Sequence, residues 1–149
     1  MAKKIKLNPR RFFHKVVIMD NSVLLKAFYN EEGAEQVRKL LNMSIKKECT
    51  LLAPALLEFE FLNSISKSYN NFTDVDKAYN KFKKLDIGMI NPTDKYVMEA
   101  ILDVYNVSQI SYYDASYHAL ARDLDAVFLT ADKKYYDLMK KKGHVELFC

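Results

Sequence analysis

The chain has 149 residues, half of them hydrophobic, and a formal net charge of +4 at pH 7. This length and apolar content predict one domain with a buried core. No apolar run approaches the roughly 20 residues that span a bilayer, and the two cysteines, Cys49 and Cys149, are too few for a disulfide scaffold. We therefore expect a cytoplasmic protein with reduced thiols and no membrane contact.

Apolar runs alternate with segments of helical periodicity along the chain. Nearly continuous apolar strands are typical of a parallel sheet with helices on both faces. We therefore predict a three-layer α/β/α fold with a central, mainly parallel sheet of four to five strands. The predicted elements, in chain order, are a strand over 16–19, helices over 22–29 and 33–47, a strand over 50–53, helices over 54–69 and 73–85, a strand over 87–90, helices over 93–106 and 112–124, a strand over 126–129, a helix over 132–142 and a strand over 145–148.

Four residues are predicted to begin helices. Pro54 suits a first helical turn, where its missing N–H is no loss. Thr73, Thr93 and Ser111 are predicted N-caps, because a side-chain hydroxyl accepts a hydrogen bond from the free N–H groups of a first turn.

Basic residues gather before the first predicted strand. Residues 1–15 hold six lysines and arginines and no acid, whereas the rest of the chain holds 17 basic and 19 acidic residues. We expect a basic N-terminal arm over 1–15 and a single domain over 16–149. Such an arm suits contact with nucleic-acid phosphates, but it can equally be a solubilising, partly disordered tail.

Four acids lie in settings that solubility alone does not explain: Asp20, Glu60, Asp114 and Asp132. In parallel α/β sheets the working crevice lies beyond the carboxyl ends of the strands, and Asp20 and Asp132 fall at that edge. If the fold gathers the four carboxylates, they repel one another and need a cation. Mg²⁺ and Mn²⁺ prefer such oxygen ligands, and a metal site of this kind can act on a phosphodiester.

The sequence around these acids resembles the PIN domain family, in particular the VapC-type toxin ribonucleases of VapBC toxin–antitoxin pairs. The resemblance extends from residue 16 to residue 148. Four stretches carry it, in chain order: 17–25 (VIMDNSVLL), 53–63 (APALLEFEFLN), 111–117 (SYYDASY) and 129–132 (LTAD).

This resemblance implies an endoribonuclease that depends on Mg²⁺ or Mn²⁺. In that reading Asp20, Glu60, Asp114 and Asp132 are the catalytic metal ligands, with Asp132 bound either directly or through water. A metal-activated water attacks RNA and leaves 5′-phosphate and 3′-hydroxyl ends. The resemblance also implies a homodimer and a VapB-type antitoxin partner, whose tail occupies the acidic groove.

Glu58 competes with Glu60 for the role of second acid. Two residues apart on a helix, they point about 200° apart, so only one can face the site. The family pattern has Asn three residues after its Glu, which favours Glu60 followed by Asn63 and leaves Glu58 as a solvated charge. We expect Ser22, Asn63 and Thr130 to hold carboxylates or water near the metal, although each can equally be a cap or a buried hydrogen bond.

Other functions were weighed against the toxin ribonuclease. A PIN nuclease that processes stable RNA fits the same residues. A catalytically silent PIN module that binds RNA or protein is less consistent with the presence of all four acids. A phosphoacceptor receiver needs paired acids after the first strand, and a haloacid-dehalogenase-like phosphatase needs Asp-x-Asp. The stretch Asp20-Asn21-Ser22 offers neither.

Overall fold

The structure is a computed structural model that describes residues 7–107 and 110–148. Residues 1–6 of the predicted arm, residues 108–109 and Cys149 lie outside the described residues. The elements are η1 (Pro9–Phe12), β1 (Val16–Met19), α1 (Asn21–Phe28), α2 (Ala34–Ile45), β2 (Thr50–Pro54), α3 (Leu56–Tyr69), α4 (Phe72–Lys83), β3 (Ile87–Ile90), α5 (Lys95–Val107), α6 (Tyr112–Asp123), β4 (Val127–Thr130), α7 (Lys133–Met139), η2 (Lys140–Lys142) and β5 (Val145–Leu147).

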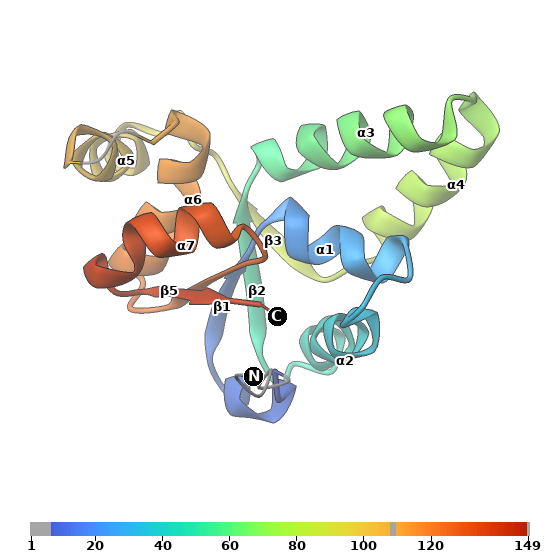
Figure 1. The fold of residues 1–149 in the computed structure, drawn as a ribbon, viewed down its shortest axis with the longest axis horizontal. Helices are drawn as coiled ribbons and strands as arrows, with labels where there is room; N and C mark the ends of the chain where they lie inside the picture. The colour runs from blue at the N-terminus through green and yellow to red at the C-terminus, as the bar shows by residue number, and fades with distance from the viewer. Residues whose placement is uncertain (1–6, 108–109, 149) are drawn as a thin grey trace.

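The strands form one parallel sheet in the order β3-β2-β1-β4-β5. Helix α6 packs across β1, β2 and β4, and α5 packs on α6, whereas α1 and α2 contact the sheet from the other face. Figure 1 shows these two helical layers on the left and right of the strands, with the α3–α4 hairpin extending from the top of the molecule. The predicted three-layer fold with a mainly parallel sheet is confirmed.

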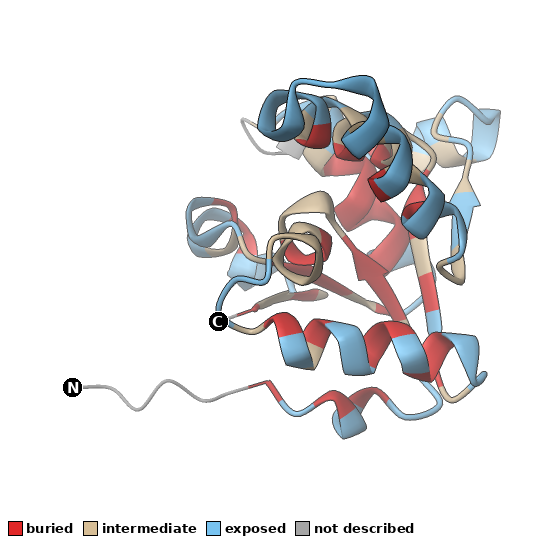
Figure 2. Cartoon of the chain, turned by 90° about the vertical axis from the view of Figure 1, so that its right-hand side faces the viewer, coloured by how far each residue is buried: buried red, intermediate tan, exposed pale blue. Residues whose placement is uncertain are grey.

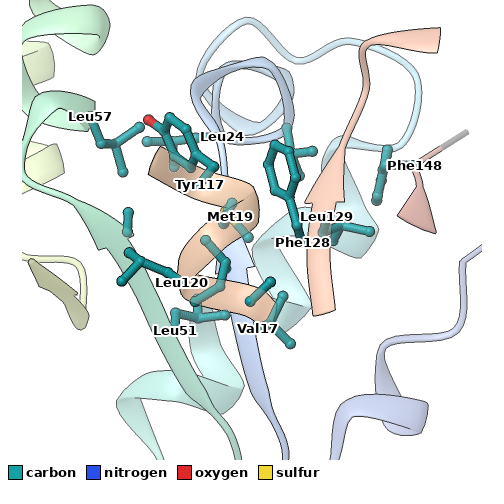
Figure 3. Packing of buried hydrophobic residues seen from close by; sticks show 14 of the residues in the cluster. Val17, Met19, Leu24, Leu51, Leu57, Tyr117, Leu120, Phe128, Leu129 and Phe148 are labelled. Carbon is teal, nitrogen blue, oxygen red and sulfur yellow. The ribbon is translucent and has the colours of Figure 1, made fainter. Parts of the chain in front are cut away.

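The core explains why the strand sequences are almost continuously apolar. In β1, Val17, Ile18 and Met19 have no exposed surface, because helices cover both faces of the sheet. Burying one such side chain contributes about 1.5–3 kcal/mol. Figure 2 shows that burial is concentrated in the strands and on the inner faces of the helices, and Figure 3 shows Tyr117 and Leu120 of α6 among the core side chains.

Two of the predicted N-caps are wrong. Helix α4 is capped by Asn71, which accepts a hydrogen bond from the N–H of Asp74 (2.9 Å), and not by Thr73. Helix α5 is capped by Asp94, whose Oδ1 accepts from the N–H of Tyr96 (3.1 Å). In both places a second polar residue lies within two positions, and amide or carboxylate oxygens cap at least as well as a threonine hydroxyl.

Pro54 ends a strand and does not begin a helix. It is the last residue of β2 and pairs with Ile90 of β3, and α3 begins two residues later at Leu56. Ser111 caps α6 as predicted, since its hydroxyl accepts from the N–H of Asp114 (3.1 Å). The helix predicted over 132–142 changes at Lys140 into a short 3₁₀ turn, η2.

Residues 7–15 of the basic arm are packed against the domain. Leu7, Pro9 and Phe12 are buried, and Arg11 forms an ion pair with Glu146 (2.7 Å). This part of the arm is therefore an ordered extension of the fold. Among the residues that the structure describes, no helix is both long enough and apolar enough to span a bilayer.

Candidate functional site

Asp20 lies at the carboxyl end of β1, where three donors hold its carboxylate. Oδ1 accepts hydrogen bonds from the hydroxyl of Ser22 (2.5 Å) and the N–H of Val23 (3.1 Å). Oδ2 accepts a hydrogen bond from the hydroxyl of Thr130 (2.6 Å). The bond to Val23 also makes Asp20 the N-cap of α1. Donors from α1 and β4 thus fix the orientation of this carboxylate.

The same two hydroxyls connect Asp20 to the end of β4. Ser22 Oγ accepts from the N–H of Ala131 (3.0 Å), and Thr130 Oγ1 accepts from the N–H of Asp132 (3.1 Å). Each hydroxyl therefore donates to Asp20 and accepts from the backbone. Ser22 and Thr130 therefore contact the Asp20 carboxylate, and their role beside a metal stays a prediction.

Glu60 lies on α3, and a tyrosine from α6 holds its side chain. The hydroxyl of Tyr117 donates to Oε1 of Glu60 (2.6 Å), and the ring of Tyr117 stacks on Phe128 at 5.5 Å between centroids. In Figure 3 this hydroxyl points toward α3. The contact of Tyr117 with Glu60 was not predicted from the sequence. The position of Tyr117 three residues after Asp114 puts both on one helix face, which was the available signal.

Glu58 is held by a different helix. It accepts a hydrogen bond from the hydroxyl of Tyr79 on α4, so it is a half-buried helix contact and not a solvated charge. Asn63 is exposed, and its side chain makes no hydrogen bond with another described residue. Its neighbour Ser64 accepts from Nδ2 of Asn21 (3.0 Å) and so joins α3 to α1.

Asp114 and Asp132 occupy the starts of two helices. Asp114 is half-buried in the first turn of α6, where the helix dipole favours an anion. Asp132 is exposed and caps α7, since its Oδ1 accepts from the N–H of Tyr135 (3.0 Å). Each therefore also has an ordinary helix-start role.

Burial and mutual repulsion raise the pKa of three of these carboxyls above their ordinary values. For Asp20 the pKa is raised first by burial and further by Asp114, against the opposing effect of its hydrogen bonds. For Glu60 the pKa is raised by burial and then by Asp20 and Asp114. For Asp114 it is raised by burial and then by Asp132. The four acids interact and so share one region, and we call them the acid cluster.

The acid cluster has the donor chemistry of a divalent-cation site. Within the described part of the chain, none of its members forms an ion pair with Lys, Arg or His. Across residues 7–107 and 110–148, no group of three or more His, Cys, Asp and Glu side chains is close enough to enclose a metal ion. The arrangement fits a cation such as Mg²⁺, which takes one or two carboxylates directly and keeps several waters.

His118, four residues after Asp114, is not available as a metal ligand. It is buried, and both ring nitrogens are used: Nδ1 lies 2.7 Å from the hydroxyl of Tyr135 and Nε2 lies 2.8 Å from the carbonyl oxygen of Gly143. A carbonyl can only accept, so Nε2 carries the proton and Nδ1 accepts from Tyr135. Burial lowers the pKa of His118, which keeps the ring neutral.

Solved structures with the same fold include three from toxin–antitoxin systems. VapBC2 from Rickettsia felis bound to a promoter DNA fragment gives a TM-score of 0.65 at 11% identity, covering 90% of this chain and 99% of that chain. VapBC-1 from nontypeable Haemophilus influenzae gives a TM-score of 0.64 at 15% identity, covering 89% of this chain and 98% of that chain. A toxin–antitoxin complex from Klebsiella pneumoniae gives a TM-score of 0.62 at 13% identity, covering 89% of this chain and 98% of that chain. At these identities the likeness establishes the fold alone.

A search of curated protein sequences found no significant match. The family model for the PIN domain, in contrast, matches residues 17–141, a span that runs from β1 to η2 and contains all four members of the acid cluster. The sequence match covers most of the chain and the topology agrees with it, so this chain belongs to the PIN domain family.

Proposed function

We propose that this chain is an endoribonuclease that depends on Mg²⁺ or Mn²⁺ and serves as the toxin of a toxin–antitoxin pair. The acid cluster is the observation that carries the proposal, because four interacting carboxylates have no cationic side chain among the described residues to balance them. The PIN family membership and the fold shared with toxin–antitoxin complexes support it.

Asp20, Glu60, Asp114 and Asp132 would hold the cation, directly or through water. When bound, a divalent cation supplies a Lewis acid for a phosphoryl oxygen and lowers the pKa of a water. Ser22 and Thr130 keep the Asp20 carboxylate in one orientation. Tyr117 occupies Oε1 of Glu60, so Oε2 stays available to ligate or to accept a proton. The raised pKa of Glu60 suits a group that accepts a proton.

Purified protein and end-mapped RNA test this function directly. The unaltered chain should cleave RNA with Mg²⁺ or Mn²⁺, leave 5′-phosphate ends and lose activity in a chelator. Asp20→Asn should abolish cleavage. Glu58→Gln is the matched control, because Glu58 contacts α4 and not the acid cluster. Cleavage that persists in Asp20→Asn or in the chelator would refute the proposal. RNA binding without cleavage would favour the silent module, and cuts confined to stable-RNA precursors would favour a processing nuclease.

A homodimer and an antitoxin both need protein-binding surface, and two exposed apolar faces support this part of the proposal. One lies on the α3–α4 hairpin, where Phe59 and Phe72 are 76% and 82% exposed. The other lies on α5, where Tyr96 is 81% exposed and Leu102 and Tyr105 are partly exposed. We assign the α5 face to the second copy. Leu102→Glu should then give a monomer by light scattering, and an unchanged mass would exclude this face.

A further inference from the structure

The segment around α7 is strongly basic and directly follows Asp132 of the acid cluster. Residues 133–142 hold five of the 23 basic residues and one of the 19 acidic residues, so the rest of the chain holds 18 of each. These ten residues therefore carry a formal charge of +4. We call their lysines the lysine ridge; they are Lys133, Lys134, Lys140, Lys141 and Lys142.

The lysine ridge keeps an excess of positive charge in the folded chain. All five side chains are exposed. Asp137 lies between two of them, with Nζ of Lys133 at 2.5 Å and Nζ of Lys140 at 3.2 Å from its two oxygens. These lysines, Lys133 first, lower the pKa of Asp137. One carboxylate cannot neutralise five cations, and the other three lysines make no ion pair with a described residue.

The ridge begins next to Asp132 of the acid cluster and is anchored to α6, the helix that carries Asp114. Asp132 caps α7 and directly precedes Lys133. The hydroxyl of Tyr135 donates to His118, and His118 donates to the carbonyl of Gly143, so α6 is bonded both to α7 and to the residue that follows η2. Helix α6 also carries Asp114, so one helix supports both the ridge and one member of the acid cluster; α6 and α7 are labelled next to each other in Figure 1.

We propose that the lysine ridge binds the backbone phosphates of single-stranded RNA on one side of the cleaved bond. This inference rests on the proposed ribonuclease function. It follows from the position of the lysine ridge next to the acid cluster. One phosphate of the RNA would bind the cation held by the acids, and phosphates further along the strand would contact the lysines. An acidic protein segment fits less well, because its own carboxylates would approach the acid cluster. The ridge extends from the acid cluster only along α7 and η2, so it would bind the RNA on only one side of the cleaved bond.

The salt dependence of RNA binding tests the ridge independently of cleavage. The full chain is titrated into a fluorescent single-stranded RNA of mixed sequence, in a chelator, between about 50 and 200 mM salt. Each lost phosphate contact lowers the slope of log affinity against log salt by about 0.7, so Lys140/Lys141/Lys142→Gln should lower it by about 2. The matched control is Lys81/Lys83/Lys84→Gln at the end of α4, on the opposite side of the molecule from α7 (Figure 1), which should keep the slope.

The outcomes separate this inference from the proposed function. An unchanged slope in the ridge variant, with active wild-type enzyme, would overturn the ridge alone. A lowered slope in a chain that never cleaves RNA would keep the ridge and refute the nuclease. If the ridge variant binds a polyglutamate peptide less tightly than the unaltered chain does, and its salt dependence of RNA binding is unchanged, the ridge would bind an acidic protein instead. All the substituted lysines are exposed, so thermal unfolding should confirm that both triple variants fold.

Discussion

Asp114→Asn should stabilise the chain without a cation and remove most of the stabilisation that a cation gives. In the free chain the charge of Asp114 is unfavourable, because burial and then Asp132 raise the pKa of this carboxyl. Asparagine has the same shape and no charge, so it relieves that repulsion. Its amide oxygen is a weaker cation ligand than a carboxylate, so it also weakens the proposed metal site.

The cation effect can be estimated from mass action. A cation at about 100 times its dissociation constant stabilises the folded chain by about 2.7 kcal/mol. In a domain of this size, one kcal/mol shifts Tm by about 2–4 °C, so the wild-type Tm should rise by about 5–11 °C. If Asp114→Asn weakens binding about 100-fold, the same cation concentration contributes about 0.4 kcal/mol, or about 1–2 °C.

Thermal unfolding at neutral pH, first in a chelator and then with Mn²⁺ or Mg²⁺, measures both effects. Asp137→Asn is the control, because Asp137 is paired with two lysines and lies outside the acid cluster. It should keep the full cation-induced shift. An equal cation-induced shift in wild type and Asp114→Asn would refute the reasoning.

The pH dependence in the chelator gives a second check with a definite sign. Between the ordinary value of 3.8 and the raised pKa of Asp114, the folded chain holds a proton that the unfolded chain has released. Wild-type stability should therefore fall as pH rises through that window, and Asp114→Asn should show a smaller fall, because only Asp20 and Glu60 still contribute to it. Cation affinity should rise with pH, because the carboxylates must first lose their protons.

Two further substitutions test other parts of the structure. Tyr117→Phe removes the donor to Glu60 but keeps the ring stack on Phe128. Cleavage should fall about 10- to 100-fold, and the pH–rate profile should shift to higher pH, because this hydrogen bond lowers the pKa of Glu60. In Gly33→Ala the new Cβ would lie 2.5 Å from Phe148 Cε1 at a φ of +89°. This should destabilise the fold by about 2 kcal/mol and lower Tm by about 4–8 °C, measurable by calorimetry.

The strands were predictable because each is an apolar run with clear polar limits. The strand over 16–19 is flanked by Lys15 and Asp20, and β1 has the predicted bounds. Helix starts were harder, because several capping residues compete within a few positions. Asn71 caps α4 in place of Thr73, and its Nδ2 also donates to the carbonyl of Tyr69 (2.8 Å). Which residue caps the helix depends on the backbone conformation of the preceding turn, and local propensity does not predict that conformation.

The acids were predictable from their local motifs, but their partners were not. Tyr117 reaches Glu60 across 57 residues of sequence, and Tyr79 reaches Glu58 from a separate helix. These contacts arise only in the folded chain, where Glu60 of α3 meets Tyr117 of α6 and Glu58 of α3 meets Tyr79 of α4. A sequence pattern within one element therefore identifies the candidate acids and the helix face that they share. It does not identify the residues on other elements that form hydrogen bonds with them.

The hydrogen bonds of each acid predict that the same substitution has opposite effects at two positions. Asp114 accepts one side-chain hydrogen bond, from Ser111, and burial outweighs its effect on the pKa, so Asp114→Asn should stabilise the free chain. Asp20 accepts from Ser22, Val23 and Thr130, and its carboxylate oxygens are acceptors only. In Asp20→Asn one oxygen becomes an NH₂ donor that faces another donor, which should destabilise the chain by about 1–3 kcal/mol even though a buried charge is removed. Calorimetry of both variants in a chelator measures whether each substitution raises or lowers the free energy of unfolding. If both variants were stabilised, repulsion would dominate at Asp20 as well, and the hydroxyls of Ser22 and Thr130 would have only a minor part in holding it.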